Sequence, residues 1–185
     1  MTIEESQMKQ GKNMADGDSG SDLLSLRKAK FAEIKAAAQY GTNPFNIEMK
    51  FIITTIIDKG TNEKKSVLRF GDSGFHMEIA QQLCVELMNS VLGANDITMK
   101  APYVYVSKDG TMVPLGTIIN TVDKEFTIEI KGGGMLYKND SKKQIYVWGR
   151  STNYGAPDFA EVVKLLESAY TNYSTFNKNP TDDKH

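Results

Sequence analysis

Two polar stretches of this sequence could bind an anion. The first, residues 72–77, reads Asp-Ser-Gly-Phe-His-Met and places His76 at the start of a predicted helix. The second, residues 149–155, reads Gly-Arg-Ser-Thr-Asn-Tyr-Gly, follows an apolar strand and precedes another predicted helix. The first N–H groups of a helix have no acceptor within it, and the helix dipole favours negative charge there. Both stretches are therefore candidate phosphate or oxyanion sites.

His76 is the only histidine outside the C-terminal end of the chain. An imidazole in a first helical turn feels the positive end of the dipole, which favours its neutral form. Neutral imidazole is the form that a general base or a nucleophile needs near pH 7. A surface or capping histidine is the simpler interpretation, and these residues alone leave it open.

Three cations accompany the two stretches. Lys50 shares one face of a predicted strand with Ile52 and Ile56, so it is either solvated at a sheet edge or directed into a pocket. Arg69 ends the next predicted strand, and Arg150 precedes Ser151. Taken singly, each arginine is more often a solvated side chain.

Other common chemistries find no support in the sequence. Two histidines, one of them terminal, and a single cysteine argue against a metal site, and we expect no cofactor. Cys84 falls within a helical apolar stripe, which is typical of a small core residue and not of a nucleophile. The sequence has no phosphate-binding Gly-x-x-x-x-Gly-Lys loop, His-Glu-x-x-His helix, Gly-x-Ser-x-Gly elbow or Cys-x5-Arg loop.

The bulk composition indicates an ordinary globular domain. A length of 185 residues fits one domain with extra length at the ends, and the net charge of −1 argues against nucleic-acid or anionic-membrane partners. No apolar run approaches the roughly 20 residues of a membrane-spanning helix, and the N-terminus lacks the apolar region of a signal peptide. We therefore expect a cytoplasmic protein.

The pattern of apolar residues predicts an α+β domain with a single sheet and two main helices. Residues 1–20 read as a disordered tail and 21–42 as an N-terminal helix, reaching about Tyr40, with a linker. The domain then covers 45–178, and 179–185 form a second tail. Its expected strands are 48–58, 65–70, 103–106, 112–115, 117–122, 126–130, 135–138, 144–150 and 173–176, and its expected helices are 73–92 and 159–170.

Five separated pieces of the chain resemble the Janus/Ocnus family, whose characterised members are protein phosphohistidine phosphatases. They are Met49-Lys-Phe51, Phe75-His76, Ile130-Lys-Gly-Gly-Gly-Met135, Lys143-Gln-Ile-Tyr-Val-Trp-Gly-Arg-Ser151 and Asn153-Tyr-Gly155. The resemblance covers roughly 46–94 and 124–177 with the elements in family order. It implies a small mixed sheet flanked by two helices, and a metal-independent hydrolase acting on phosphohistidine-containing proteins.

The resemblance also implies roles for individual residues. His76 is the general base or the phosphate acceptor, Lys50 binds phosphate, and Ser151 is the serine of the turn. Backbone amides of His76, Met77, Ser151 and Thr152 surround the phosphoryl oxygens. Arg69 maps less directly onto a family arginine, because a one-residue gap is needed before His76.

Two features depart from the family pattern. Met135 stands where an arginine often follows the three glycines, and Arg150 is a candidate substitute for that cation. Residues of about 95–123 form an insertion, in which we expect a β-hairpin over 103–115. The insertion and the N-terminal helix are candidate partner surfaces. A non-catalytic phosphate- or phosphopeptide-binding module, or a scaffold protein, remains the alternative to the enzyme.

Overall fold

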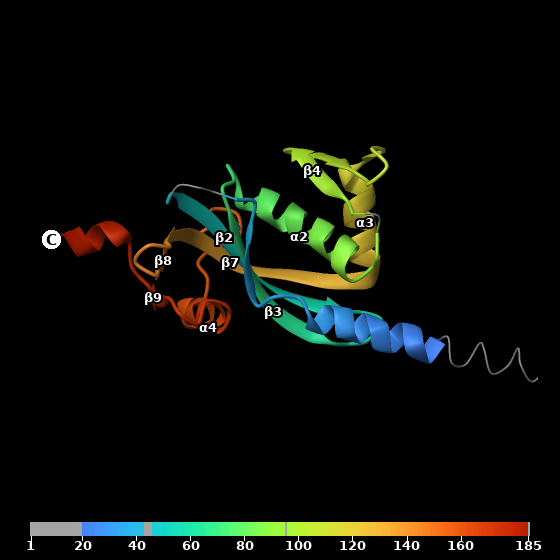
Figure 1. The fold of residues 1–185 in the computed structure, drawn as a ribbon, viewed down its shortest axis with the longest axis horizontal. Helices are drawn as coiled ribbons and strands as arrows, with labels where there is room; N and C mark the ends of the chain where they lie inside the picture. Colours follow the sequence, from blue (N-terminus) through green and yellow to red (C-terminus); the bar gives the residue numbers. More distant parts are fainter. Residues whose placement is uncertain (1–19, 43–45, 95, 185) are drawn as a thin grey trace, which may run out of the picture.

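The computed structural model describes residues 20–42, 46–94 and 96–184, and its main sheet has the strand order β1-β3-β2-β7-β8-β9 (Figure 1). The β1–β3 and β8–β9 pairs are parallel, and the other neighbours are antiparallel. The expected α+β class with a mixed sheet is therefore confirmed. The strands are β1 (Ala37–Tyr40), β2 (Glu48–Asp58), β3 (Lys64–Gly71), β7 (Phe126–Asn139), β8 (Gln144–Trp148) and β9 (Ser174–Phe176).

Helices cover both faces of this sheet. On one, which we call the α2 face, α2 (His76–Ser90) and α3 (Leu115–Glu125) pack against side chains such as Ile56 and Val67. On the other, the α4 face, α4 (Phe159–Ala169) packs against Phe51 and its neighbours. Alternate residues of a strand point to opposite faces. Lys50 therefore lies on the α2 face, on the same side of the sheet as the start of α2.

The three glycines lie inside a continuous strand. The prediction interrupted the strand at 131–134, but β7 passes through Gly132, Gly133 and Gly134 without a break. A Cβ atom on Gly133 would lie 2.5 Å from the carbonyl oxygen of Phe51, and one on Gly132 would lie 2.7 Å from the Cα of Pro157. Glycine is needed at both positions because neighbouring backbone approaches closely, and at Gly132 also because φ is +151°.

The insertion is more elaborate than the expected hairpin. The 103–115 hairpin is present as β5 (Val104–Val106) and β6 (Met112–Val113), and β4 (Thr98–Ala101) completes a separate three-stranded sheet. The predicted strand at 117–122 is wrong, because α3 covers that segment. Its β-branched residues favour a strand locally, but Ile118 and Val122 are four residues apart and both fully buried against the core of the α2 face. Burial of this one helical face overrides the local preference.

The N-terminal helix ends earlier than expected. It covers residues 20–32, and the predicted continuation to Tyr40 is wrong because Ala37–Tyr40 form β1. Pairing with β3, including a 2.7 Å hydrogen bond from the Leu68 amide to the Ala36 carbonyl oxygen, satisfies backbone groups that a helix would otherwise use. The predicted N-terminal tail falls almost wholly in 1–19, outside the described residues. The C-terminal end contains a 3-10 helix, Pro180–Lys184.

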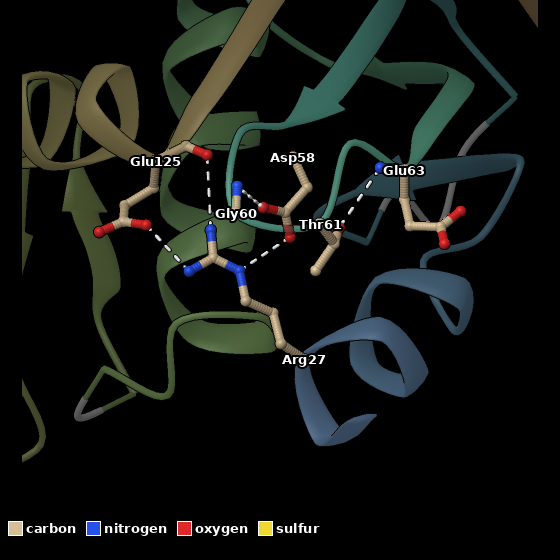
Figure 2. Close-up of polar contacts among 6 residues, drawn as sticks. All are labelled: Arg27, Asp58, Gly60, Thr61, Glu63 and Glu125. Carbon is tan, nitrogen blue, oxygen red and sulfur yellow. Dashed lines mark hydrogen bonds and ion pairs between the residues drawn. The ribbon is translucent and has the colours of Figure 1, made fainter. Parts of the chain in front are cut away.

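Arg27 fastens the N-terminal helix to the domain (Figure 2). Its guanidinium donates to the Asp58 carboxylate at 2.8 Å and to the Glu125 carboxylate at 2.9 Å, and it lies over the Phe126 ring at 5.4 Å. Asp58 is fully buried at the end of β2, and its other carboxylate oxygen accepts from the Gly60 amide. The helix therefore packs on the domain.

Candidate active site

His76 is the first residue of α2, and its ring rests on β7. The side chain is 9% exposed, and Nε2 lies 2.9 Å from the carbonyl oxygen of Gly134. A Cβ atom on Gly133 would lie 3.0 Å from His76 Cδ2. The triple glycine thus provides both the acceptor and the space for this ring.

This contact determines which ring nitrogen is available for chemistry. A carbonyl oxygen can only accept, so Nε2 carries a proton and donates it to Gly134. In the neutral ring the lone pair then belongs to Nδ1. Because the Nε2–Cδ2 edge faces β7, Nδ1 occupies the opposite vertex, directed away from that strand.

The surroundings of His76 favour the neutral ring. Burial lowers the pKa of His76 below its ordinary value, and the positive charge of Lys50 lowers it further. The hydrogen bond to Gly134 acts in the opposite direction, but the pKa is lowered overall. Lys50 pairs with Met135, two residues along β7 from the Gly133 on which His76 rests, so the two residues lie close together on the α2 face although they are 26 positions apart in the sequence.

The N-terminus of α2 offers free helix amides beside this ring. Phe75 is the N-cap residue and makes no capping bond through its side chain. The amides of His76 and Met77 lie in the first turn, where the helix itself supplies no acceptor. Glu78 is the acidic residue of this turn, and its carboxylate accepts a hydrogen bond from the Ser73 hydroxyl.

Lys50 lies opposite Gly71 on one neighbouring strand and Met135 on the other. Its side chain is half-buried, in a central strand of the sheet and on the α2 face. This position is not the sheet edge considered from the sequence, because β2 lies between β3 and β7. His76, Lys50 and the first amides of α2 are brought together by β2, β7 and α2.

Ser151 has a structural role that the sequence did not indicate. It is fully buried, and its amide donates to the carbonyl oxygen of Gly133 at 2.8 Å. Its hydroxyl accepts from the Tyr154 amide at 3.2 Å, and its backbone bridges to Gly155. The expectation that the Ser151 amide is free to bind phosphate is therefore wrong. Ser151 instead fixes the turn against the glycine on which His76 rests.

The second polar stretch does not lead directly into a helix. Helix α4 begins at Phe159, and the Asp158 carboxylate caps it by accepting from the amides of Ala160 and Glu161. A carboxylate already occupies this helix N-terminus, so the expected cradle built from two helix N-termini reduces to one, at α2. Arg150 and Thr152 lie exposed on either side of Ser151, in the turn after β8.

Arg69 is not available to the site, because its side chain is buried and paired within the protein. The side chain is fully buried, and it donates through Nε and Nη2 to the two oxygens of Glu86 at 2.8 and 2.7 Å. Its Nη1 donates to the carbonyl oxygens of Lys35 and Leu68, and Tyr40 donates its hydroxyl to the same Glu86. The assignment of Arg69 to phosphate binding is corrected, because this network joins β1, β3 and α2.

Comparison with known proteins shows the family of this chain. The sequence model of the Janus/Ocnus family matches residues 44–174, which is most of the chain. The chain belongs to the Janus/Ocnus family. It is also similar to the sex-regulated protein janus-A of Drosophila pseudoobscura pseudoobscura, with 44% identity over 45 residues. That match covers 24% of this chain and 30% of the relative, so the chain spans less than a third of the curated relative it matches.

Met135 adjoins Lys50 in the sheet. It lies directly between Lys50 on β2 and Trp148 on β8 in the register of the sheet, on the α2 face. A methionine here brings bulk and no charge next to the lysine. The sequence indicated that Met135 departs from the family pattern, but only the register of the strands shows that this residue adjoins Lys50.

Two further observations concern the described part of the chain. Residues 20–42, 46–94 and 96–184 contain no cluster of three or more His, Cys, Asp or Glu side chains that could hold a metal ion. Among the same residues, every helix is too short or too polar to cross a membrane.

Proposed function

We propose that this Janus/Ocnus protein is a metal-independent phosphatase that removes the phosphoryl group from phosphohistidine on proteins. The observation that carries the proposal is the state of His76, which combines a lowered pKa with a proton donated from Nε2 to Gly134. A neutral ring with a lone pair on Nδ1 suits both a general base and a nucleophile.

The reaction assigns a role to each group at the site. Water attacks phosphorus and gives its proton to His76 Nδ1, while the P–N bond breaks and its electron pair returns to the imidazole of the substrate. The leaving imidazole then takes up the proton held by His76, which restores the neutral ring. If His76 instead attacks phosphorus, it carries the phosphoryl group until water releases it as phosphate. Both routes return the enzyme to its starting state.

Positive potential for the phosphoryl oxygens comes from Lys50 and from the first amides of α2. Phosphoryl transfer depends mainly on positioning and electrostatic stabilisation, because little covalent chemistry is demanded of the protein. The amides of His76 and Met77 and the ammonium of Lys50 suit this task. Thr152 and Arg150 are additional candidates, since both are exposed near this edge of the site.

The experiment is phosphate release from a phosphohistidine peptide by the full-length protein, with and without excess chelator. We expect turnover at the same rate in both conditions. Turnover that is lost on chelation and restored by one particular divalent metal would contradict the metal-independent mechanism. Absence of turnover in both conditions would contradict the proposal that the protein is an enzyme.

A specific observation also supports a second candidate, a non-catalytic phosphopeptide-binding module. Met135 contributes no charge at a position beside Lys50, where the resemblance to the family leads us to expect an arginine. Such a module would bind a phosphohistidine peptide without releasing phosphate. The same assay, combined with a binding measurement on the peptide, distinguishes the two candidates.

A further inference from the structure

The half of the α2 face next to Lys50 is organised in rows across the sheet. The first row holds Lys50, Met135 and Trp148, which are register partners on β2, β7 and β8. The second row is formed by Glu48, Tyr137, Tyr146 and Phe176. Figure 1 shows α2 running away from β8 and β9 toward α3, so this half of the face lies beyond the start of the helix.

The second row is largely aromatic. The rings of Tyr137 and Tyr146 have centroids 6.4 Å apart, and those of Tyr146 and Phe176 are 5.1 Å apart. The half-buried Tyr137 and the nearly buried Tyr146 form the floor of a cavity of about 390 Å³. Gln144 borders it from β8, Asn46 borders it from the segment before β2, and Pro180 borders it from the C-terminal 3-10 helix.

We propose that this cavity is a specificity subsite that receives a large uncharged side chain of the substrate polypeptide, near its phosphohistidine. The inference rests on the proposed function, and it makes the substrate a folded or extended polypeptide instead of a free phosphoramidate. It also names Tyr137 and Tyr146 as specificity-determining residues of the site.

The spacing of the rows fits a polypeptide. Residues rise about 3.3 Å along a strand, so the row of Tyr137 lies about 7 Å from Lys50 and about 13 Å from the row of Gly133, on which His76 rests. An extended substrate advances by a similar distance per residue. The side chain that reaches the cavity is therefore about two to four residues from the phosphohistidine.

The lining favours an uncharged occupant. Glu48 and Lys142 are the charged residues of the lining, and their opposite charges offset one another. The remaining lining combines phenol rings and amide side chains with Pro180 and Thr181, and such a surface accepts an apolar or aromatic side chain and a peptide backbone beside it. A strongly basic substrate side chain would be attracted by Glu48 and repelled by Lys142, and an acidic one would experience the reverse.

The test compares peptides that carry one phosphohistidine and a single leucine, placed two, three or four residues to either side in a glycine-serine background. The leucine-free peptide and free phosphohistidine serve as reference substrates. We expect one leucine position to raise kcat/KM by on the order of 10-fold or more, mainly through KM, which is the usual discrimination of an apolar subsite.

Two variants locate the effect in the cavity. Asn46→Trp fills the cavity from an exposed position outside the strands, and Tyr137→Ala removes part of its floor. Both should abolish the leucine preference and leave hydrolysis of free phosphohistidine unchanged. Tyr103→Ala is the matched control, because this exposed tyrosine lies in the insertion and does not line the cavity.

The outcomes separate this inference from the proposed function. If wild-type protein hydrolyses every substrate with no leucine preference, or if Asn46→Trp keeps the preference, the subsite is refuted and the phosphatase stands. If wild-type protein hydrolyses neither peptides nor free phosphohistidine, the proposed function is wrong and the subsite is refuted with it.

Discussion

At the scale of single residues, the site depends on how each polar group is occupied. His76 donates from Nε2 and keeps Nδ1 for chemistry, whereas Arg69 and Ser151 have all or most of their polar groups engaged within the protein. The sequence indicated every one of these residues as a candidate. It could not tell the free groups from the occupied ones, because their partners, Gly134, Glu86 and Gly133, are distant in the chain.

Replacement of Lys50 tests the phosphate site. Lys50→Met keeps most of the side-chain volume and removes one charge-assisted contact, which costs about 1.5–3 kcal/mol, or on the order of 10- to 100-fold in phosphate affinity. Phosphate titration followed by NMR measures this. Lys108→Met, at an exposed turn of the insertion, is the control and should bind like wild type. Equal affinity in both variants would place Lys50 outside the site.

The lowered pKa of His76 predicts the pH dependence of activity. If the neutral ring is required, kcat/KM rises with pH through the ionisation of His76 in the free enzyme, at a pKa below the ordinary value. The pH–rate profile on a phosphohistidine peptide measures it. An acid limb with its midpoint above the ordinary histidine value of about 6.5 would contradict the assignment.

The same shift predicts the pH dependence of stability. As pH falls below about 6.5, the histidine of the unfolded chain takes up a proton before His76 of the folded protein does. The free energy of unfolding therefore decreases with falling pH in that window. His76→Gln should weaken this decrease, as measured by denaturant unfolding at a series of pH values. An identical slope in wild type and variant would show that the folded pKa is not lowered.

At the scale of elements, long periodic segments were predicted well and context-dependent ones were not. The strand at 48–58 and the helices beginning near His76 and Phe159 follow their apolar patterns closely. The N-terminal helix was predicted too long, and α3 was mistaken for a strand. In both cases the deciding contacts are made with β3 or with α2, and no local pattern of propensity contains them.

The attachment of the N-terminal helix gives a prediction at this scale. Arg27→Ala leaves the fully buried Asp58 without its cation, so we expect a loss of about 3 kcal/mol in the free energy of unfolding. Chemical denaturation measures the change. Leu24→Ala is the control on the same helix, because Leu24 is 44% exposed. A loss below about 1 kcal/mol for Arg27→Ala would show that the pair contributes little.

At the scale of the whole molecule, the two faces of the main sheet differ: the α4 face is packed against a helix, and the α2 face carries the candidate site. The α4 face is closed by a helix whose N-terminus is capped by its own Asp158. On the α2 face, the helix begins in the middle of the sheet, so that its first amides, His76 and Lys50 lie beside the half that α2 does not cover. This division was not visible in the sequence, which placed equivalent anion sites at both helix starts.

The central claim is that neutral His76 performs the chemistry, and phosphate release by His76→Ala tests it most directly. The variant should keep the fold, verified by its thermal unfolding transition, because His76 occupies a first helical turn at the rim of the core. We predict that it binds a phosphohistidine peptide and releases no phosphate above the uncatalysed rate. A folded His76→Ala protein that releases phosphate at close to the wild-type rate would contradict the account.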